Sequence, residues 1–121
     1  MHLKTKKGSA YIHNYNHIDD TKENVLFIPG AGMDHRVADL INLDKKIFNE
    51  VISIDLPGHG GSTPTNAKTI EEYSEFISNC LSEINISKIH LCGHSMGGLV
   101  CMHLGMAYKE TFKSISLFNC Q

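Results

Sequence analysis

The sequence has no long apolar run and no block of like charge. Its 121 residues carry 11 Lys and Arg against 13 Asp and Glu, a formal net charge of −2, with the two signs interspersed. A surface for nucleic acid or anionic lipid needs clustered basic residues, and a membrane span needs roughly 18 consecutive apolar residues. We therefore expect no nucleic-acid partner and no membrane association, and we expect a cytoplasmic protein.

The sequence also lacks cysteine pairs with the spacing of a metal or redox site. The four cysteines lie in apolar segments, and no two have C-x-x-C spacing (Cys80, Cys92, Cys101 and Cys120). Free cysteine behaves as a small hydrophobic residue. We expect buried thiols rather than disulfides or a metal site, and the sequence predicts no cofactor.

No internal repeat, low-complexity tract or linker divides the chain, and its 41% hydrophobic content is that of one globular core. The first 16 residues predict an antiparallel hairpin around a Lys-Lys-Gly-Ser turn. Short apolar runs then predict buried strands at residues 24–30, 50–60, 87–93 and 112–120.

Helices are predicted between these strands. Asp34 can cap a helix whose apolar residues recur at helical spacing up to Phe48, and the stretch from Met96 to about Tyr108 predicts another. Between them, Thr69 and Glu72 form a capping-box pair ahead of an apolar stripe (Ile70, Tyr73, Phe76, Ile77, Cys80, Leu81 and Ile84). This alternation predicts an α/β fold, a mostly parallel sheet with helices on both faces.

Glycine-rich loops follow three of the predicted strands: PGAGM at 29–33, DLPGHGGS at 55–62 and GHSMGG at 93–98. The carboxyl ends of parallel strands meet at one edge of a sheet, where such folds place their chemistry. The last loop matches G-x-S-x-G between a strand and a helix, which is the context that this motif requires. It predicts a sharp turn that presents Ser95 at the positive end of a helix.

These motifs resemble the α/β-hydrolase superfamily, and more narrowly its esterase, lipase and C-C hydrolase branch, in which G-H-S-M-G-G is common. The resemblance covers the whole chain and implies that Ser95 is a nucleophile. IPGAGM resembles the family's H-G-x-x loop, so the backbone amides of Ala31 and Met96 would form the oxyanion hole, with Gly32 as a second choice to Ala31. The expected substrate-binding residues are Gly30, Gly32, Met33 and His94.

The chain departs from this pattern at Pro29, where a histidine is common. The backbone donor is unaffected, but the bracing of the loop is left open. The segment Asp55–Ser62 resembles the family's D-x-x-G-x-G-x-S turn, and we expect Asp55 and Ser62 to satisfy loop backbone groups while His59 lies near the pocket.

A serine nucleophile needs a histidine base and a carboxylate that holds it. In the resembled family both follow the strand that ends this chain. We expect His94 to support the turn and the loop residues His35 and His59 to be solvated rather than to act as base. Residues 1–121 are therefore expected to be one incomplete core domain without the last strands, cap and remaining triad residues, and inactive as it stands.

Three hypotheses for function follow. The first is a serine hydrolase acting on an ester or related small acyl substrate. The second keeps the fold and changes the reaction, to that of an aminopeptidase, C-C bond hydrolase, lactonase or lyase. The third is a non-catalytic ligand-binding member of the superfamily. The sequence does not define the substrate or the oligomeric state.

Overall fold

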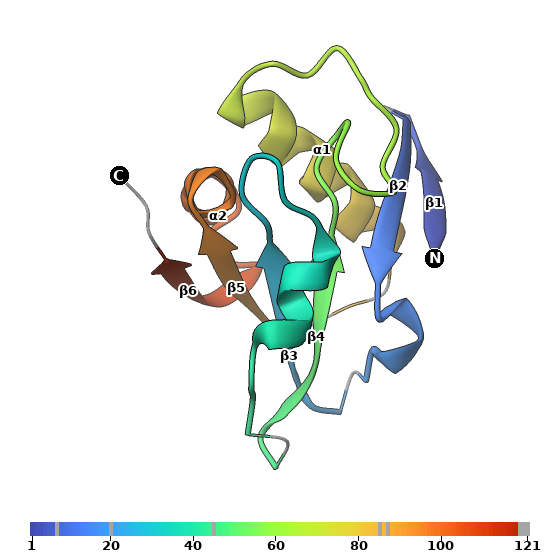
Figure 1. Ribbon diagram of the computed structural model, residues 1–121. Helices are drawn as coiled ribbons and strands as arrows, with labels where there is room; N and C mark the ends of the chain where they lie inside the picture. The colour runs from blue at the N-terminus through green and yellow to red at the C-terminus, as the bar shows by residue number, and fades with distance from the viewer. Residues whose placement is uncertain (7, 20, 45, 85, 87, 119–121) are drawn as a thin grey trace.

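The computed structural model describes residues 1–6, 8–19, 21–44, 46–84, 86 and 88–118. A six-stranded mixed sheet with the order β1-β2-β4-β3-β5-β6 forms its centre (Figure 1). The strands are β1 (His2–Thr5), β2 (Gly8–His13), β3 (Glu23–Ile28), β4 (Phe48–Ile54), β5 (Ile89–His94) and β6 (Phe112–Phe118). The predicted hairpin is confirmed as β1 and β2, and β2 also runs antiparallel to β4. The pairs β3–β4, β3–β5 and β5–β6 are parallel.

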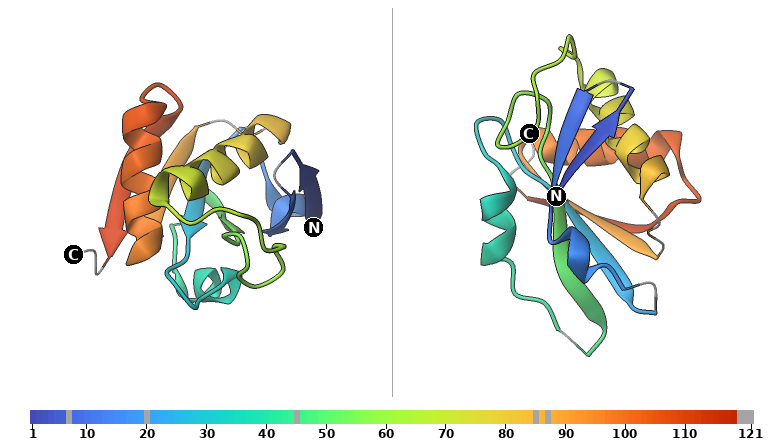
Figure 2. Two further views of the ribbon diagram at one scale, coloured as in Figure 1. Left: turned by 90° about the horizontal axis from the view of Figure 1, so that it is seen from above. Right: turned by 90° about the vertical axis from the view of Figure 1, so that its right-hand side faces the viewer.

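Two α-helices, α1 (Ile70–Glu83) and α2 (Met96–Ala107), cover one face of the sheet. The short 3-10 helix η2 (His35–Leu40) covers the other face, and η1 (Tyr15–His17) follows β2. Figure 2 shows η2 and the two α-helices on opposite sides of the sheet. The predicted α/β class is confirmed, with the larger core under α1 and α2.

Helix α1 forms as the sequence predicts. The Thr69 hydroxyl accepts a hydrogen bond from Glu72 N at 3.1 Å, which satisfies one of the amides that the first turn leaves without an intrahelical partner. Phe76, Ile77 and Cys80 from the apolar stripe are buried in the core. Helix α1 thereby covers the same face of the sheet as α2.

The helix predicted from Asp34 to Phe48 is wrong beyond its first turns. Asp34 caps as expected, accepting from Arg36 N, but η2 ends at Leu40 and Phe48 begins β4. Two of the apolar side chains in the predicted stripe face solvent: Leu40 is 83% exposed and Ile47 is 54% exposed. A turn at Asp44, which accepts from Phe48 N at 2.9 Å, separates η2 from the strand.

The remaining elements agree with the predictions apart from their ends. The strand predicted at 50–60 runs from Phe48 to Ile54, so Pro57 and the glycines after it lie in a loop. Cys80, Cys92 and Cys101 are buried thiols, as expected, whereas Cys120 lies outside the described residues. Within the described part of the chain, no helix is both long and apolar enough to cross a membrane.

Candidate active site

The loops after β3 and β5 begin side by side at the carboxyl edge of the sheet. Ile28 at the end of β3 is in register with Gly93 of β5. The loop after β4 leaves the same edge, and Figure 1 shows all three loops at this end. The residues that the sequence singled out are therefore brought to one edge by the parallel pairing.

Ser95 occupies a strained turn between β5 and α2. Its backbone dihedrals are φ 55° and ψ −119°, a region that non-glycine residues rarely adopt and that costs about 1–3 kcal/mol. It is the N-cap residue of α2, but its side chain makes no capping hydrogen bond, although serine is a favoured N-cap residue. The residue is exposed at the surface.

Two glycines make this turn possible because backbone passes where their side chains would be. A Cβ added to Gly93 would lie 2.6 Å from the carbonyl oxygen of Gly97. A Cβ added to Gly97 would lie 2.0 Å from the oxygen of Ile28 and 2.5 Å from that of Pro29. Helix α2 therefore packs directly against the end of β3.

Gly30, in the loop after β3, lies close to the turn at Ser95. A Cβ at Gly30 would lie 3.3 Å from the Cβ of Ser95, 3.0 Å from His94 O and 3.1 Å from His94 Nδ1. Of the predicted substrate-binding residues, the structure brings Gly30 and His94 together beside the serine. The position that a Cβ of Gly32 would take is open space among the described residues, apart from its chain neighbours.

The segment after Gly30 is a tight turn. Met33 N donates to Gly30 O at 3.1 Å, and Gly32 has φ +74°, which favours glycine at this position. Ala31 and Met33 are exposed on the turn. The Ala31 amide therefore lies in a short loop that starts beside Ser95.

The electrostatics of this edge suit a developing negative charge. Met96 is the first residue of α2, so its N–H is among the amides without an intrahelical acceptor. The aligned peptide dipoles give this helix end a partial positive charge. Such amides, placed beside a nucleophilic hydroxyl, stabilise the oxyanion that forms in acyl transfer.

The histidines on the loops differ from the expectation. His59 makes a local contact, with Nδ1 3.0 Å from Pro57 O. His35, which we expected to be solvated, is held by Asp55, with Nδ1 2.8 Å from Oδ2. The expected roles of Asp55 and Ser62 are confirmed, because Asp55 accepts from backbone amides and Ser62 Oγ donates to Asp55 O at 2.7 Å. Only the tertiary fold reveals the His35 partner, which is 20 residues away.

Strand β6 contacts the turn through its last described residue. Ser95 N donates to the carbonyl oxygen of Phe118 at 2.9 Å. The position of the turn therefore depends on β6 as well as on β3 and β5.

A serine–histidine–carboxylate hydrogen-bond chain lies at the end of the sheet opposite to Ser95. His90 Nδ1 is 2.7 Å from Ser114 Oγ, and His90 Nε2 is 3.4 Å from Glu23 Oε1. Lys113 donates to the same carboxylate at 3.1 Å, and this bond is the main reason why the pKa of Glu23 lies below its usual value. These hydrogen bonds link β3, β5 and β6 across the sheet surface, at the end away from the start of α2. We therefore interpret them as structural.

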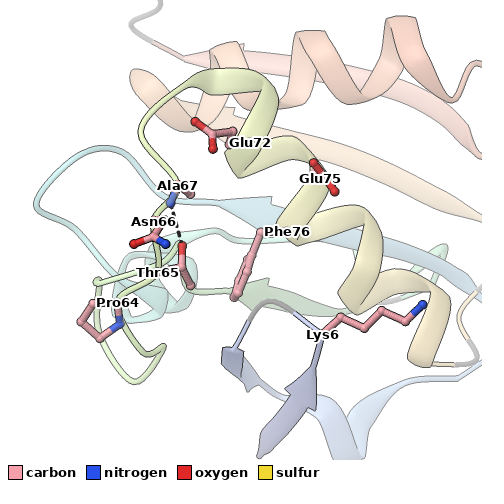
Figure 3. A pocket seen from close by; sticks show the side chains of 8 residues that line it. All are labelled: Lys6, Pro64, Thr65, Asn66, Ala67, Glu72, Glu75 and Phe76. Atoms are coloured by element: carbon pink, nitrogen blue, oxygen red, sulfur yellow. Dashed lines mark hydrogen bonds between the residues drawn. The ribbon is translucent and has the colours of Figure 1, made fainter.

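A pocket of about 440 Å³ lies away from Ser95, between the β1–β2 turn and the start of α1 (Figure 3). It is lined by Lys6, Pro64, Thr65, Asn66, Ala67, Glu72, Glu75 and Phe76. Its lining includes neither a histidine nor any residue predicted for the site. Sequence reasoning did not predict this pocket, and the residues that line it include no serine, cysteine or histidine.

Comparison with known proteins adds sequence relatives to this geometry. The sequence profile described as "alpha/beta hydrolase fold" matches residues 23–119. The chain is 36% identical over 106 residues to the dihydrolipoyllysine-residue acetyltransferase component of the acetoin cleaving system of Cupriavidus necator. It is 33% identical over 95 residues to 3-oxoadipate enol-lactonase 1 of Acinetobacter baylyi. These alignments cover 80% and 78% of this chain.

A solved structure has the same fold. An N-acyl homoserine lactonase complexed with N-butanoyl homoserine superimposes with a TM-score of 0.82 at 21% identity, over 99% of this chain. The chain spans 26% and 36% of the two curated relatives and 44% of the lactonase chain. The profile match covers well over half of the 121 residues, and the chain belongs to the α/β-hydrolase fold family.

Proposed function

We propose that residues 1–121 carry the nucleophile and the oxyanion-binding half of a serine hydrolase that cleaves carboxylic esters, linear or cyclic. The observation that carries this proposal is the strained conformation of Ser95 at the start of α2, with Gly30 beside it. Strain of this kind concentrates at functional sites, where the surrounding structure maintains it.

In the proposed reaction, Ser95 Oγ attacks the carbonyl carbon of the ester as a base removes its proton. The carbonyl oxygen gains negative charge and accepts hydrogen bonds from the amides of Ala31 and Met96. As the tetrahedral intermediate collapses to an acyl-enzyme, the base returns its proton to the alcohol oxygen. The alcohol departs from a linear ester and stays attached to the acyl group of a lactone, and water then hydrolyses the acyl-enzyme. Gly30, Gly32, Met33 and His94 surround the acyl group in this proposal.

We propose that the base and its carboxylate partner lie outside residues 1–121. The length of the relatives supports this, since the chain spans less than half of each relative described above. In this proposal residues 1–121 form one incomplete core domain and turn over esters no faster than background.

The names of two relatives support an ester or lactone as the substrate class. One relative is an enol-lactonase, and the structural neighbour is an acyl homoserine lactonase. A lactone is a cyclic ester, so the same attack on the carbonyl serves both. The acetyltransferase name of the other relative does not indicate a hydrolytic substrate.

The test is an assay of the 121-residue chain and of the longest reading frame that contains it, with p-nitrophenyl esters and a panel of lactones. We expect hydrolysis by the longer protein, and we expect Ser95→Ala to lower kcat by at least about 10³-fold. Ser116→Ala, which changes an exposed serine on β6, is the matched control. Hydrolysis that survives Ser95→Ala, or tight binding without turnover in the longer protein, would overturn the proposal.

A further inference from the structure

A buried carboxylate lies under the loops of the candidate site. Asp55 directly follows β4 and is fully buried. Its Oδ1 accepts from His35 N at 2.7 Å, and its Oδ2 is 2.8 Å from His35 Nδ1 and accepts from Gly61 N at 2.9 Å. An ionised carboxylate only accepts hydrogen bonds, so His35 Nδ1 is the donor of this pair when Asp55 is ionised. Such charge-assisted bonds are short and strong, and they offset the cost of burying the charge.

These bonds connect two loops that are distant in the sequence. His35 ends the loop that follows β3 and begins η2, whereas Gly61 belongs to the loop that follows β4. Gly60, at φ +50°, allows the close approach, because its Cβ would lie 2.1 Å from Asp55 Oδ2. The carboxylate therefore holds both loops at one point.

The imidazole of His35 is fixed on its other side by β2. Its ring centroid lies 4.4 Å from that of Tyr11 and 4.9 Å from that of His13. His13 in turn has Nε2 2.9 Å from Asp39 Oδ1 on η2. The side chain of His35 is only 20% exposed, so the ring is held between β2 and Asp55.

The loop between β3 and His35 carries the proposed oxyanion donor. One end is fixed where Ile28 pairs with Gly93, and the other end is fixed by the bonds to Asp55. A short segment tied at both ends has few backbone conformations left, so the direction of the Ala31 N–H depends on both ties. The sequence left the bracing of this loop open at Pro29, and the structure supplies a brace at its far end.

We propose that His35 and Asp55 form a clamp that positions the Ala31 amide for the oxyanion. The role of Ala31 in this proposal rests on the proposed function. The clamp itself concerns only the conformation of the loop. His35 is a positioning residue in this proposal and makes no contact with the substrate.

The test separates the clamp from the chemistry. His35→Ala removes the side-chain bond, and His35→Asn supplies an amide N–H that can donate to Asp55 in its place. His59→Ala is the matched control, since it changes a histidine at the same edge that does not contact Asp55 through any bond described above. Amide hydrogen exchange of the 121-residue chain, resolved by residue, is measured for all three variants.

We expect His35→Ala to accelerate exchange at Met33, at position 35 and at Gly61 by about tenfold or more, while the amides of β3 and β5 stay protected. We expect His35→Asn to restore most of the protection and His59→Ala to leave it unchanged. Unchanged exchange in His35→Ala would overturn the clamp, whether or not any hydrolysis is found. Accelerated exchange throughout the sheet would overturn it too, because His35 would then support the whole fold.

The second measurement uses the longest reading frame that contains the chain. We expect His35→Ala to lower kcat by about 10- to 100-fold with a smaller change in KM, because removing a hole donor outright costs about 10²- to 10³-fold. We expect His35→Asn to recover most of the rate. If His35→Asn restores protection but is as slow as His35→Ala, the imidazole takes part in the chemistry and the positioning role is wrong. An inactive wild-type protein would contradict the proposed function, and the exchange result would still decide the clamp.

Discussion

At the scale of single residues, the conformation of Ser95 is the feature that ordinary folding requirements explain least. A positive φ with ψ near −119° costs about 1–3 kcal/mol of folding free energy, a cost that a glycine would not have. The contacts of Gly93, Gly97 and Gly30 around the turn hold the serine in this conformation. The strain is consistent with selection for a hydroxyl at this position.

This strain predicts that Ser95→Gly stabilises the chain. Glycine relieves the backbone strain but loses about 0.5–1 kcal/mol through its greater freedom when unfolded, which leaves a net gain of about 1 kcal/mol. Ser95→Ala keeps the strain and should change the free energy of unfolding by less than about 0.5 kcal/mol. Urea unfolding of both variants checks this. A glycine variant less stable than the alanine variant would show that the turn is not strained.

The buried thiols predict a loss of stability at alkaline pH. Burial raises the pKa of Cys80 to about 12 and that of Cys92 to about 11. In the unfolded chain a thiol ionises from about pH 8.5, so above this pH the unfolded state loses protons that the folded state keeps. The free energy of unfolding should therefore fall, by up to about 1.4 kcal/mol per pH unit for each thiol, until the pH reaches the folded value.

Urea unfolding between pH 8 and pH 10.5 measures this slope. Cys80→Ala is the comparison, since it removes one thiol and leaves the lysines and tyrosines that also titrate in this range. We expect a shallower slope in the variant, whatever its stability at pH 7. Equal slopes in the two proteins would mean that the Cys80 thiol ionises as readily in the fold as in the unfolded chain.

At the scale of elements, the packing of α2 against β3 fixes the geometry of the site. Gly97 lies where the helix meets the carbonyl oxygens of Ile28 and Pro29. Backbone atoms cannot move aside as a flexible side chain can. Any side chain at this position must therefore push the helix, with Met96 at its start, away from the loop that carries Ala31.

Gly97→Ala should accordingly destabilise the chain by about 3 kcal/mol, at the upper end of the usual cost of overpacking. The matched control is Gly105→Ala on the same helix. There the added Cβ would lie 2.2 Å from Cδ1 of Ile115, the end of a flexible side chain that can move aside, and alanine gains helix propensity over glycine. Thermal and urea unfolding of the pair measure the difference, and equal stabilities would mean that α2 does not pack on β3 as described.

Elements also show how far the sequence could predict the fold. Helix α1 was predictable because its cap and its apolar stripe agree with each other. The end of the helix expected after Asp34 was not predictable, because Leu40 and Ile47 suggest a buried stripe but face solvent. The turn at Asp44 interrupts the expected helix. Local spacing cannot distinguish an apolar residue that is buried from one that is not.

The candidate site divides in the same way. The position of Ser95 follows from a local motif, because strand, glycine turn and helix are consecutive in the sequence. The bond between His35 and Asp55 joins residues 20 positions apart across two loops, and no local pattern marks it. Tertiary pairing of this kind is visible only once the strands have been placed.

At the scale of the whole molecule, β6 lies at the end of the strand order in the described residues. It exposes Ile115, Leu117 and Phe118, each at 40% or more. Exposed apolar strands with unpaired backbone groups tend to pair with other chains. The 121-residue chain should therefore self-associate as its concentration rises.

Sedimentation velocity over a concentration series checks this. Leu117→Lys should weaken the association by about tenfold, since a charge on an edge strand opposes pairing. Leu40→Lys is the control, because Leu40 is 83% exposed on η2, away from the edge. A chain that stays monomeric at every concentration, or an equal effect of both substitutions, would contradict the role of β6.

The central claim is that Ser95 is a nucleophile placed beside backbone donors, and covalent labelling tests it most directly. The longest reading frame that contains the chain is treated with a fluorophosphonate, and the site of the adduct is mapped by peptide mass spectrometry, with Ser95→Ala as the control. We expect one adduct, on Ser95, that is absent from the control. An active protein that carries no adduct on Ser95, or that is labelled on another residue, would contradict it.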